Sequence, residues 1–380
     1  MSVLLTGATG FLGCRLLREL LADWPEETFT VLGRGTAQQL RERTESAVTW
    51  LDSPPLAPGA LERVRYLGAD ITDPGLGLSP EDRARIVDGL TTVWHGAARL
   101  ALEGDPAPLY KANVVGTGHV LRLAEEAPGA HMVHISTAFV AGRRRQGCIG
   151  EEDLSESDGF ETVYEETKHT AERLVRAWAL SAPRRTTTVL RPSLLVTDRR
   201  VPEGLPGQPL DILSRTLDGL LRNAAGHVKA VDRLLARAHR RGDEMRLRLT
   251  GDPEASLNLL QADYAVRAMV RAVRSRAGEP GLRTMHVTHP VNTELGVAFA
   301  AFESRYPGLA LSLEMSVPDP TRYEASIHQY GPWMLKYAMH RRTYDRTHLL
   351  RAVGDLPDPE PIDQAYLLRA LGYAGESLPA

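Results

Sequence analysis

The stretch TGATGFLG at residues 6–13 decides the fold. It follows an apolar run at 3–5 and opens an amphipathic segment at 11–22, which predicts the order strand, glycine turn, helix. Glycines at this spacing permit a tight turn, close approach of the backbone to a pyrophosphate, and close packing of helix on strand. Glycine turns also serve plain strand-to-helix connections, but this context favours a dinucleotide site at the helix N-terminus. The expected contacts come from Gly7, Thr9, Gly10, Phe11, Leu12 and Gly13.

Outward from this turn, the first 200 residues alternate short apolar runs with longer helical patterns. The expected strands lie at 3–5, 29–32, 64–67, 93–95, 132–135 and 188–190, and the helix-length segments between them include 11–22, 108–126 and 162–180. This alternation predicts an α/β protein of the Rossmann type, a doubly wound parallel sheet with helices on both faces.

The pattern changes beyond residue 192, which predicts a second, smaller unit. A Pro/Gly loop leads into Arg-rich helical sequence at 211–241, followed by sheet-like sequence at 245–250, a helix at 263–276 and a strand at 285–288. We therefore expect a NAD(P)-binding domain at 1–197, with 251–290 returning to it, and a substrate-binding lobe built from 198–250 and 291–380. The lobe should close over the carboxyl edge of the sheet, where such sheets bind ligands.

Composition excludes several classes of protein. Lys and Arg total 45 against 48 Asp and Glu, so the net charge of −3 gives no global attraction to nucleic acid. Two cysteines, Cys14 and Cys148, are too few for a disulfide framework or a four-thiolate metal site. Histidines show no metal-binding spacing, so no metal is expected. No apolar run approaches the roughly 20 residues of a membrane span, and without a signal peptide the expected location is the cytoplasm.

Arg34 indicates which dinucleotide is bound. Sites for NAD usually have an acid at the end of the second strand, but here that strand ends in Gly33 and Arg34. An arginine suits the 2′-phosphate, so NADP(H) is preferred over NAD(H). The alternative is a solvated surface arginine in an arginine-rich chain.

Tyr164 and Lys168 form a candidate catalytic pair. Their i, i+4 spacing places them on one face of the helix expected at 162–180. An ammonium beside a phenol lowers the pKa of the phenol and prepares it for proton transfer. Ser136 and Thr137 place hydroxyls at the end of the strand at 132–135, on the edge where the cofactor is expected. The alternative is an ordinary surface pair on a helix.

These residues together resemble the extended short-chain dehydrogenase/reductases. The resemblance is closest to the branch of thioester reductases and fatty acyl reductases, and it covers residues 1–200, with a weaker echo at 257–268. The motifs that carry it are TGATGFLG (6–13), ADI (69–71), LGLSPED (76–82), WHGAA (94–98), NVVGT (113–117), HISTAFVAG (134–142), YEETKHTAE (164–172) and LRPS (190–193).

The resemblance implies roles for individual residues. Tyr164 would be the general acid, and Lys168 would hold the nicotinamide ribose and lower the pKa of the tyrosine. Thr137 would hydrogen-bond the substrate carbonyl, with Ser136 as the alternative hydroxyl. The other implied cofactor contacts are Asp70 and Ile71 beside the adenine, Ala97 and Ala98 along the central part, Asn113 in the following helix, and Pro192 and Ser193 at the carboxamide.

Two features leave alternatives open, and two further expectations follow. Asn113 either supports a proton relay or bonds the backbone after the fourth strand. The run Arg143 to Arg145 either grips a phosphate of coenzyme A or a phosphopantetheine arm, or is a solvated basic loop. Residues 337–346 are expected to form a helix with its aromatic side chains inward, and Asp263 to cap a helix.

The leading hypothesis is an NADP-dependent reductase of an acyl thioester or of a derived aldehyde or ketone. The acyl group would arrive as a small molecule or on a carrier protein, and the resemblance also implies a homodimer. The alternative enzyme is an NAD-dependent nucleotide-sugar epimerase or dehydratase, which shares the Tyr-x-x-x-Lys pair. The third hypothesis is a non-enzymatic NADP sensor, in which Tyr164 would be dispensable.

Overall fold

The computed structural model describes residues 1–102, 104–211, 244–306, 308–330 and 335–372. A central sheet of seven parallel strands has the order β12-β7-β5-β4-β1-β2-β3. Its strands are β1 (Ser2–Thr6), β2 (Thr28–Gly33), β3 (Val64–Gly68), β4 (Leu90–His95), β5 (His131–Ile135), β7 (Thr186–Pro192) and β12 (Gly281–Val287). All six strands expected from the first 200 residues are present, and the predicted doubly wound sheet is confirmed.

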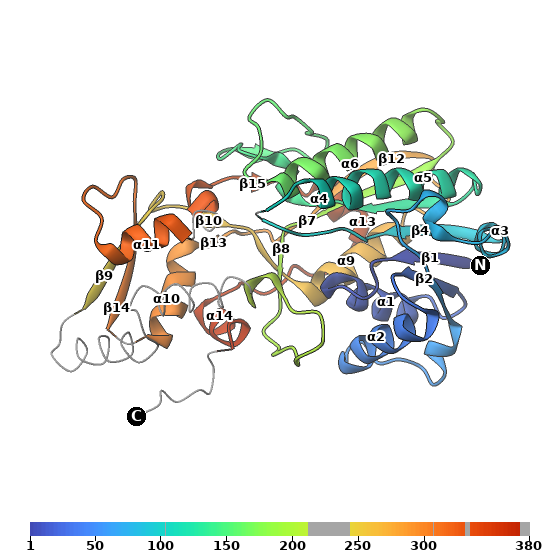
Figure 1. Cartoon of the computed structure of the whole chain (residues 1–380), viewed down its shortest axis with the longest axis horizontal. Helices are drawn as coiled ribbons and strands as arrows, with labels where there is room; N and C mark the ends of the chain where they lie inside the picture. Colours follow the sequence, from blue (N-terminus) through green and yellow to red (C-terminus); the bar gives the residue numbers. More distant parts are fainter. Residues whose placement is uncertain (103, 212–243, 307, 331–334, 373–380) are drawn as a thin grey trace.

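Helices cover both faces of this sheet (Figure 1). One face packs against α1 (Phe11–Asp23), α2 (Ala37–Trp50), α9 (Ala262–Arg274) and α13 (Thr347–Val353). The other packs against α3 (Pro80–Val87), α5 (Gly116–Glu125) and α6 (Val163–Leu180). With both faces covered, the strands are almost continuously buried, which is typical of parallel sheets.

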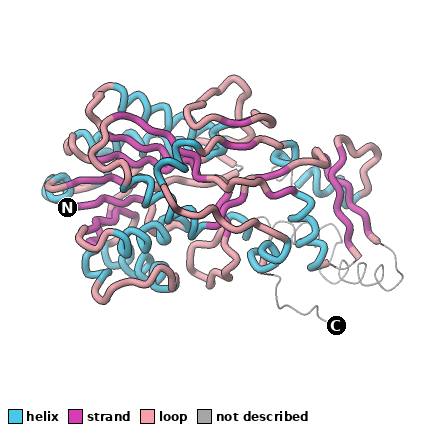
Figure 2. The backbone as a smooth tube through the Cα atoms, turned by 180° about the vertical axis from the view of Figure 1, so that it is seen from behind, coloured by secondary structure: helices cyan, strands magenta, loops and turns pink. Residues whose placement is uncertain are grey.

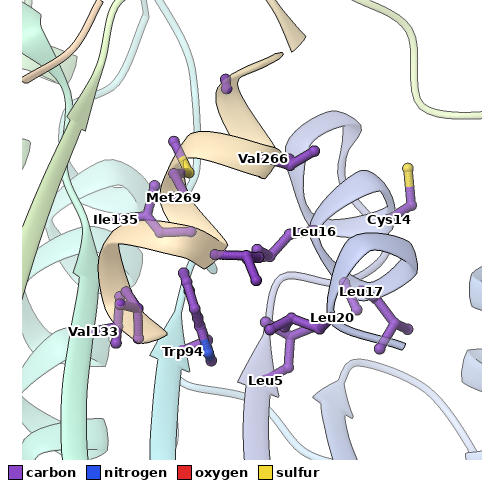
Figure 3. Close-up of a cluster of buried hydrophobic side chains, with 14 of the residues drawn as sticks. Leu5, Cys14, Leu16, Leu17, Leu20, Trp94, Val133, Ile135, Val266 and Met269 are labelled. Atoms are coloured by element: carbon purple, nitrogen blue, oxygen red, sulfur yellow. The ribbon is translucent and has the colours of Figure 1, made fainter. Parts of the chain in front are cut away.

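The core beside the glycine turn fixes the position of α1. Leu16 and Leu20 of α1 are fully buried with Trp94 of β4, and Met269 of α9 joins the same cluster. Figure 3 shows these side chains between α1, α9 and the strands. The N-terminus of α1 is thereby held at the carboxyl end of β1.

The segment predicted as one helix at 108–126 contains a wider turn. It begins as α4 (Ala107–Tyr110), continues as a π-helical turn (Lys111–Val115), and ends as α5. Such turns insert one extra residue into a helix and are frequent at functional sites. Asn113 lies in the middle of this one.

Beyond β7, short elements outside the main sheet form what we call the smaller lobe, although three of its strands, at 194–196, 256–257 and 259–261, lie in ranges that the prediction gave to the nucleotide-binding domain. Its strands are β8 (Leu194–Val196), β9 (Met245–Thr250), β10 (Ser256–Leu257), β11 (Leu259–Gln261), β13 (Thr293–Glu294) and β14 (Leu309–Glu314), and its helices are α10 (Leu295–Arg305), α11 (Arg322–Tyr330) and α14 (Gln364–Ala370). The parallel pair β9 and β14 lies away from the main sheet (Figure 2). The helical prediction for 211–241 falls, apart from Asp211, outside the described residues.

Two local predictions are wrong. Residues 337–346 form a short 3-10 turn (Lys336–Met339) and the strand β15 (Thr343–Tyr344), which pairs with β6 (Cys148–Ile149), because sheet pairing overrides the weak local helical preference. Asp263 does not cap α9, whose N-cap is Gln261. It lies in the first turn instead, where its carboxylate is 3.5 Å from Arg15 Nε.

The division of the chain into domains stays a prediction. Within the C-terminal part assigned to the lobe, Leu349 and Val353 of α13 are buried in the core beside the main sheet. This helix is therefore packed on the nucleotide-binding side of the molecule.

Candidate active site

The glycine turn has the geometry that its sequence predicts. Gly7 has a φ of +85°, and a Cβ there would lie 2.7 Å from the backbone of Gly96 and Ala97. A Cβ on Gly13 would lie 1.9 Å from the Gly7 carbonyl oxygen, so this glycine allows α1 to pack on the turn. Gly10 is different, because a Cβ would meet its nearest neighbour, the Gly7 oxygen, at 3.4 Å. The surrounding protein therefore leaves room for a side chain at Gly10. A ligand that lies close to the backbone here would explain the glycine.

The start of α1 can hold an anion. Gly10 is its N-cap, no described side chain caps the helix, and its first turn carries no acid. The N–H groups of this turn and the positive end of the helix dipole suit a phosphate. The structure thus places Thr9, Gly10, Phe11 and Leu12 where a pyrophosphate could be bound.

Positive charge gathers at the ends of β2 and β3. Arg34 is exposed, and its carbonyl oxygen accepts a hydrogen bond from the Arg43 guanidinium of α2. Burial alone would raise the pKa of Asp70, but the Thr72 N–H (2.8 Å) and the charges of Arg34 and Lys111 hold that pKa below its usual value. Arg43 was not predicted from sequence, since only the fold of α2 brings it back to this edge.

The two hydroxyls after β5 have different surroundings. Ser136 Oγ donates to Glu172 Oε2 at 2.7 Å inside a buried network. Among the described residues, the contacts of Thr137 Oγ1 are longer: it accepts from the Phe139 N–H at 3.3 Å and donates to the Pro192 carbonyl at 3.4 Å. Ser136 is therefore committed to the protein, and Thr137 is the hydroxyl that can turn to a ligand.

Tyr164 and Lys168 lie one turn apart near the start of α6, beside the end of β5. Thr162 caps this helix by accepting the Glu165 N–H at 3.3 Å. The Lys168 ammonium donates to the Ile135 carbonyl at 2.6 Å, and burial lowers the pKa of this lysine to about 8. The Tyr164 hydroxyl has no hydrogen-bond partner among the described residues.

The expected lowering of the Tyr164 pKa is wrong for this state of the protein. Burial raises the pKa of the phenol to about 12, and the neighbouring Glu165 carboxylate adds to the rise. Desolvation disfavours the phenolate, and the Lys168 ammonium is directed to Ile135 instead. Tyr164 is consequently protonated at neutral pH.

Asn113 links the segment after β4 to α6. Its amide oxygen accepts the Arg99 N–H at 2.7 Å, and its amide nitrogen donates to the Arg99 carbonyl and to Thr167 Oγ1, both at 3.0 Å. Thr167 in turn donates to the Tyr164 carbonyl at 2.9 Å. These bonds use both amide hydrogens and the amide oxygen. Of the two interpretations of Asn113, they therefore favour the one in which it holds the backbone, and not the proton relay.

A buried ionic network joins α6, β7 and the segment after β5. Glu172 and Arg191 are fully buried and joined by hydrogen bonds of 2.7 and 3.0 Å, and Arg176 Nε adds a third at 3.0 Å. Burial alone would raise the pKa of Glu172, but Arg191 holds it below its usual value. The network fixes Ser136, and hence the start of the Thr137 loop.

The far side of the site contains an unpaired hydroxyl. Ser193 is 6% exposed, and its Oγ has no hydrogen-bond partner among the described residues, whereas its N–H donates to Val287. Pro192 ends β7 and Ser193 follows it, and Ala97 and Ala98 follow β4, at the same edge of the sheet. A buried hydroxyl without a partner fits a ligand group, such as a carboxamide, that would satisfy it.

The arginine run is engaged by carboxylates. A guanidinium nitrogen of Arg144 lies 2.9 Å from a carboxylate oxygen of Asp153. Guanidinium nitrogens of Arg143 and Arg145 each lie 3.7 Å from a carboxylate oxygen of Glu161. This arrangement favours a basic loop tied to the protein over a phosphate grip. No group of three or more potential metal ligands is found in the described ranges. No helix in the part of the chain that the structure describes is both long and apolar enough to cross a bilayer.

Comparisons with known proteins agree with this geometry. The family model described as male sterility protein, an NAD-binding family, matches residues 5–269. Human fatty acyl-CoA reductase 1 is 30% identical over 150 residues, which are 38% of this chain and 29% of that enzyme. The chain thus covers less than a third of that relative.

Solved structures share the fold. The terminal R domain of the myxalamid PKS-NRPS pathway has a TM-score of 0.73 at 23% identity, covering 98% of this chain and 92% of that domain. A thiolation-reductase di-domain of an archaeal non-ribosomal peptide synthetase has 0.68 at 18%, covering 98% and 74%. UDP-glucuronic acid 4-epimerase of Bacillus cereus has 0.61 at 16%, covering 98% of each chain. The chain belongs to the male sterility protein family of NAD-binding domains.

Proposed function

We propose that this protein is an NADPH-dependent reductase that delivers hydride to the carbonyl carbon of an acyl thioester, or of the aldehyde or ketone derived from it. The observation that carries the proposal is the 2.6 Å hydrogen bond from Lys168 to Ile135, which holds the helix of Tyr164 and Lys168 against the strand that leads to Thr137.

The chain has the groups that a nicotinamide dinucleotide needs. The N-terminus of α1 and the glycine turn would hold the pyrophosphate, Asp70 and Ile71 would flank the adenine, and Ser193 would bond the carboxamide. Arg34 and Arg43 would pair with a 2′-phosphate, and no acid ends β2, which supports NADPH over NADH. When bound, the cofactor supplies the hydride.

The side chains then stabilise the negative charge that develops on the carbonyl oxygen and supply the proton that this oxygen takes. The Thr137 hydroxyl donates a hydrogen bond to the substrate carbonyl oxygen and orients it. As the carbon accepts hydride, the C=O π electrons move to the oxygen, which takes the proton of the Tyr164 phenol. A pKa of about 12 keeps this phenol protonated at neutral pH, as reduction requires. In this step the buried Lys168 ammonium, which is bonded to Ile135 in the structure, would turn to the phenolate that remains and stabilise it. With a thioester, the resulting hemithioacetal releases the thiol and leaves an aldehyde.

The form of the substrate follows from the relatives. A fatty acyl-CoA reductase matches 150 residues of the chain, and a solved thiolation-reductase di-domain has the same fold. Both support a thioester, carried by coenzyme A or by a carrier protein. The sugar-nucleotide epimerases share the fold as well, but the arginines at the end of β2 do not suit the NAD that such enzymes retain.

Isotope transfer tests the proposal. The protein is incubated with a hexanoyl thioester and NADPH deuterated at C4, in separate R and S forms, and the product is identified by mass. We expect deuterium from one of the two forms on the former carbonyl carbon. Unlabelled product, or interconversion of UDP-sugars without net oxidation of the cofactor, would refute it.

A further inference from the structure

The smaller lobe contains an apolar cavity of about 150 Å³. Its walls come from β9, β14 and α10, including Leu247, Leu249, Leu311, Leu313, Phe299 and Phe302. Thr293, Glu294 and Tyr337 are the polar members of the described lining. The Tyr337 hydroxyl already donates a hydrogen bond to Glu165, and Glu294 is exposed to solvent. Among these described lining residues, a phosphate or sugar would therefore find no cation and few free partners.

The cavity adjoins the reaction centre through Leu194. This residue lines the cavity and directly follows Ser193. The carbonyl of Pro192, two residues earlier, accepts the Thr137 hydroxyl at 3.4 Å. One wall of the cavity is thus continuous with the segment that flanks the catalytic hydroxyl.

Tyr337 connects the cavity to both catalytic segments. Its ring lines the cavity and packs edge-on against Phe139, with centroids 5.3 Å apart, two residues after Thr137. Its hydroxyl donates to Glu165 Oε1 at 2.6 Å, on the residue that follows Tyr164. The other Glu165 oxygen accepts the Glu161 N–H at 2.8 Å. Tyr337 consequently stands between the cavity and the two residues that act on the carbonyl.

The size of the cavity limits what can occupy it. An apolar cavity of this volume holds a molecule about as large as benzene and stays free of water. Its lining atoms lack contacts on one side, and an apolar occupant would restore these contacts. A dodecyl chain is too long to fit within the described walls.

We propose that this cavity is a specificity pocket for the compact apolar end of the acyl group, a phenyl ring or an alkyl end of about five or six carbons. The thioester carbonyl would then lie on the other side of Tyr337, beside Thr137 and Tyr164. This inference rests on the proposed function and adds the class of acyl group that the site selects.

Acyl chain length is the first test. We would measure kcat/KM with NADPH for acetyl, butanoyl, hexanoyl, 3-phenylpropanoyl and dodecanoyl coenzyme A. Each methylene that enters the cavity should raise kcat/KM by about fourfold, mainly through KM. We expect a maximum at hexanoyl or 3-phenylpropanoyl and a fall at dodecanoyl. Equal values for all five, or a maximum at dodecanoyl, would overturn the inference and leave the proposed function standing.

A matched pair of variants on α10 locates the effect. Ala298 lines the cavity, whereas Ala300 does not and lies on another side of the same helix. Ala298→Leu should reduce the ratio of hexanoyl to acetyl kcat/KM at least tenfold, and Ala300→Leu should leave this ratio unchanged. Equal ratios in the two variants would overturn the assignment of the cavity.

Direct binding of toluene needs no turnover and separates this inference from the proposed function. Toluene should raise the Tm of the wild type and of Ala300→Leu saturably, and the shift should be lost in Ala298→Leu. If no thioester is reduced, the proposed function fails, but the toluene shift still reports on the cavity. Absence of the shift in the wild type would overturn the inference. A shift together with a flat chain-length profile would identify a packing void and overturn it as well.

Discussion

Lys168 is fastened to the last residue of β5, because its ammonium donates a 2.6 Å hydrogen bond to the carbonyl oxygen of Ile135. This bond joins α6 to the strand that leads to Thr137. Burial also lowers the pKa of the lysine to about 8. Lys168 is thus a structural link and a group that titrates near neutral pH.

The pH dependence of the reaction should follow Lys168. Its pKa in the folded protein lies below the ordinary value, so the ammonium is present below about pH 8 and is lost above it. We expect kcat/KM for thioester reduction to fall as the pH rises through about 8, since the neutral amine no longer stabilises the phenolate. Lys168→Arg, which stays charged, should show no inflection there, whatever its absolute rate. A flat wild-type profile between about pH 6 and about pH 10 would contradict this role.

The hydroxyls of Ser136 and Thr137 should separate stability from catalysis. Ser136→Ala removes a hydrogen bond to the buried Glu172 carboxylate and should cost about 1.5–3 kcal/mol of unfolding free energy, with kcat nearly unchanged. Thr137→Val should lower kcat by about 10²–10³-fold, the usual effect of losing one donor to a reacting oxygen. Urea unfolding and steady-state kinetics on both variants give the comparison. The reverse pattern would identify Ser136 as the catalytic hydroxyl.

Arg34 and Arg43 should discriminate between the two cofactors. Charged hydrogen bonds to a phosphate contribute about 1.5–3 kcal/mol, so Arg34→Ala should raise the KM for NADPH by about tenfold or more. The KM for NADH should change little, and Arg43→Ala should act in the same direction. Arg41 provides a control, because it is exposed, lies on α2 like Arg43, and pairs with Glu45. Equal effects of Arg34→Ala on the two cofactors would leave Arg34 as a solvated surface residue.

The ion pair of Glu172 and Arg191 should be coupled. Removing one partner leaves a buried, unpaired charge, so Arg191→Leu should destabilise the fold by about 3–5 kcal/mol. The double variant Glu172→Leu/Arg191→Leu should lose less than the sum of the single variants, measured by urea unfolding. Additive losses would mean that the two charges do not depend on each other.

The central sheet could be predicted from sequence because its signals are local. The buried runs of the strands, the glycine turn at residues 6–13, and the helix that carries Tyr164 and Lys168 all depend on neighbouring residues. Six predicted strands and the glycine geometry are therefore found in the structure. Ser136 and Thr137 directly follow β5, at the carboxyl edge of the sheet, as the strand pattern predicted.

The parts that could not be predicted depend on distant contacts. Spacing alone suggested that Lys168 lowers the pKa of Tyr164, but burial, a tertiary property, raises it. Residues 337–346 resemble a helix locally, yet β15 pairs with β6, which is nearly 200 positions earlier in the chain. Tyr337 and Arg43 were missed for the same reason, since only the fold brings them to Glu165 and to the end of β2.

The most direct test of the central claim is a turnover assay with matched hexanoyl substrates. NADPH and NADH oxidation would be followed with the coenzyme A thioester, the pantetheine thioester, the aldehyde and a ketone, using Tyr164→Phe as control and mass spectrometry to identify products. We predict that the thioesters are reduced with NADPH, and that Tyr164→Phe abolishes most of this turnover while still binding NADPH. Reduction of the aldehyde or ketone alone would make the protein a carbonyl reductase, and normal turnover by Tyr164→Phe would contradict the proposed mechanism.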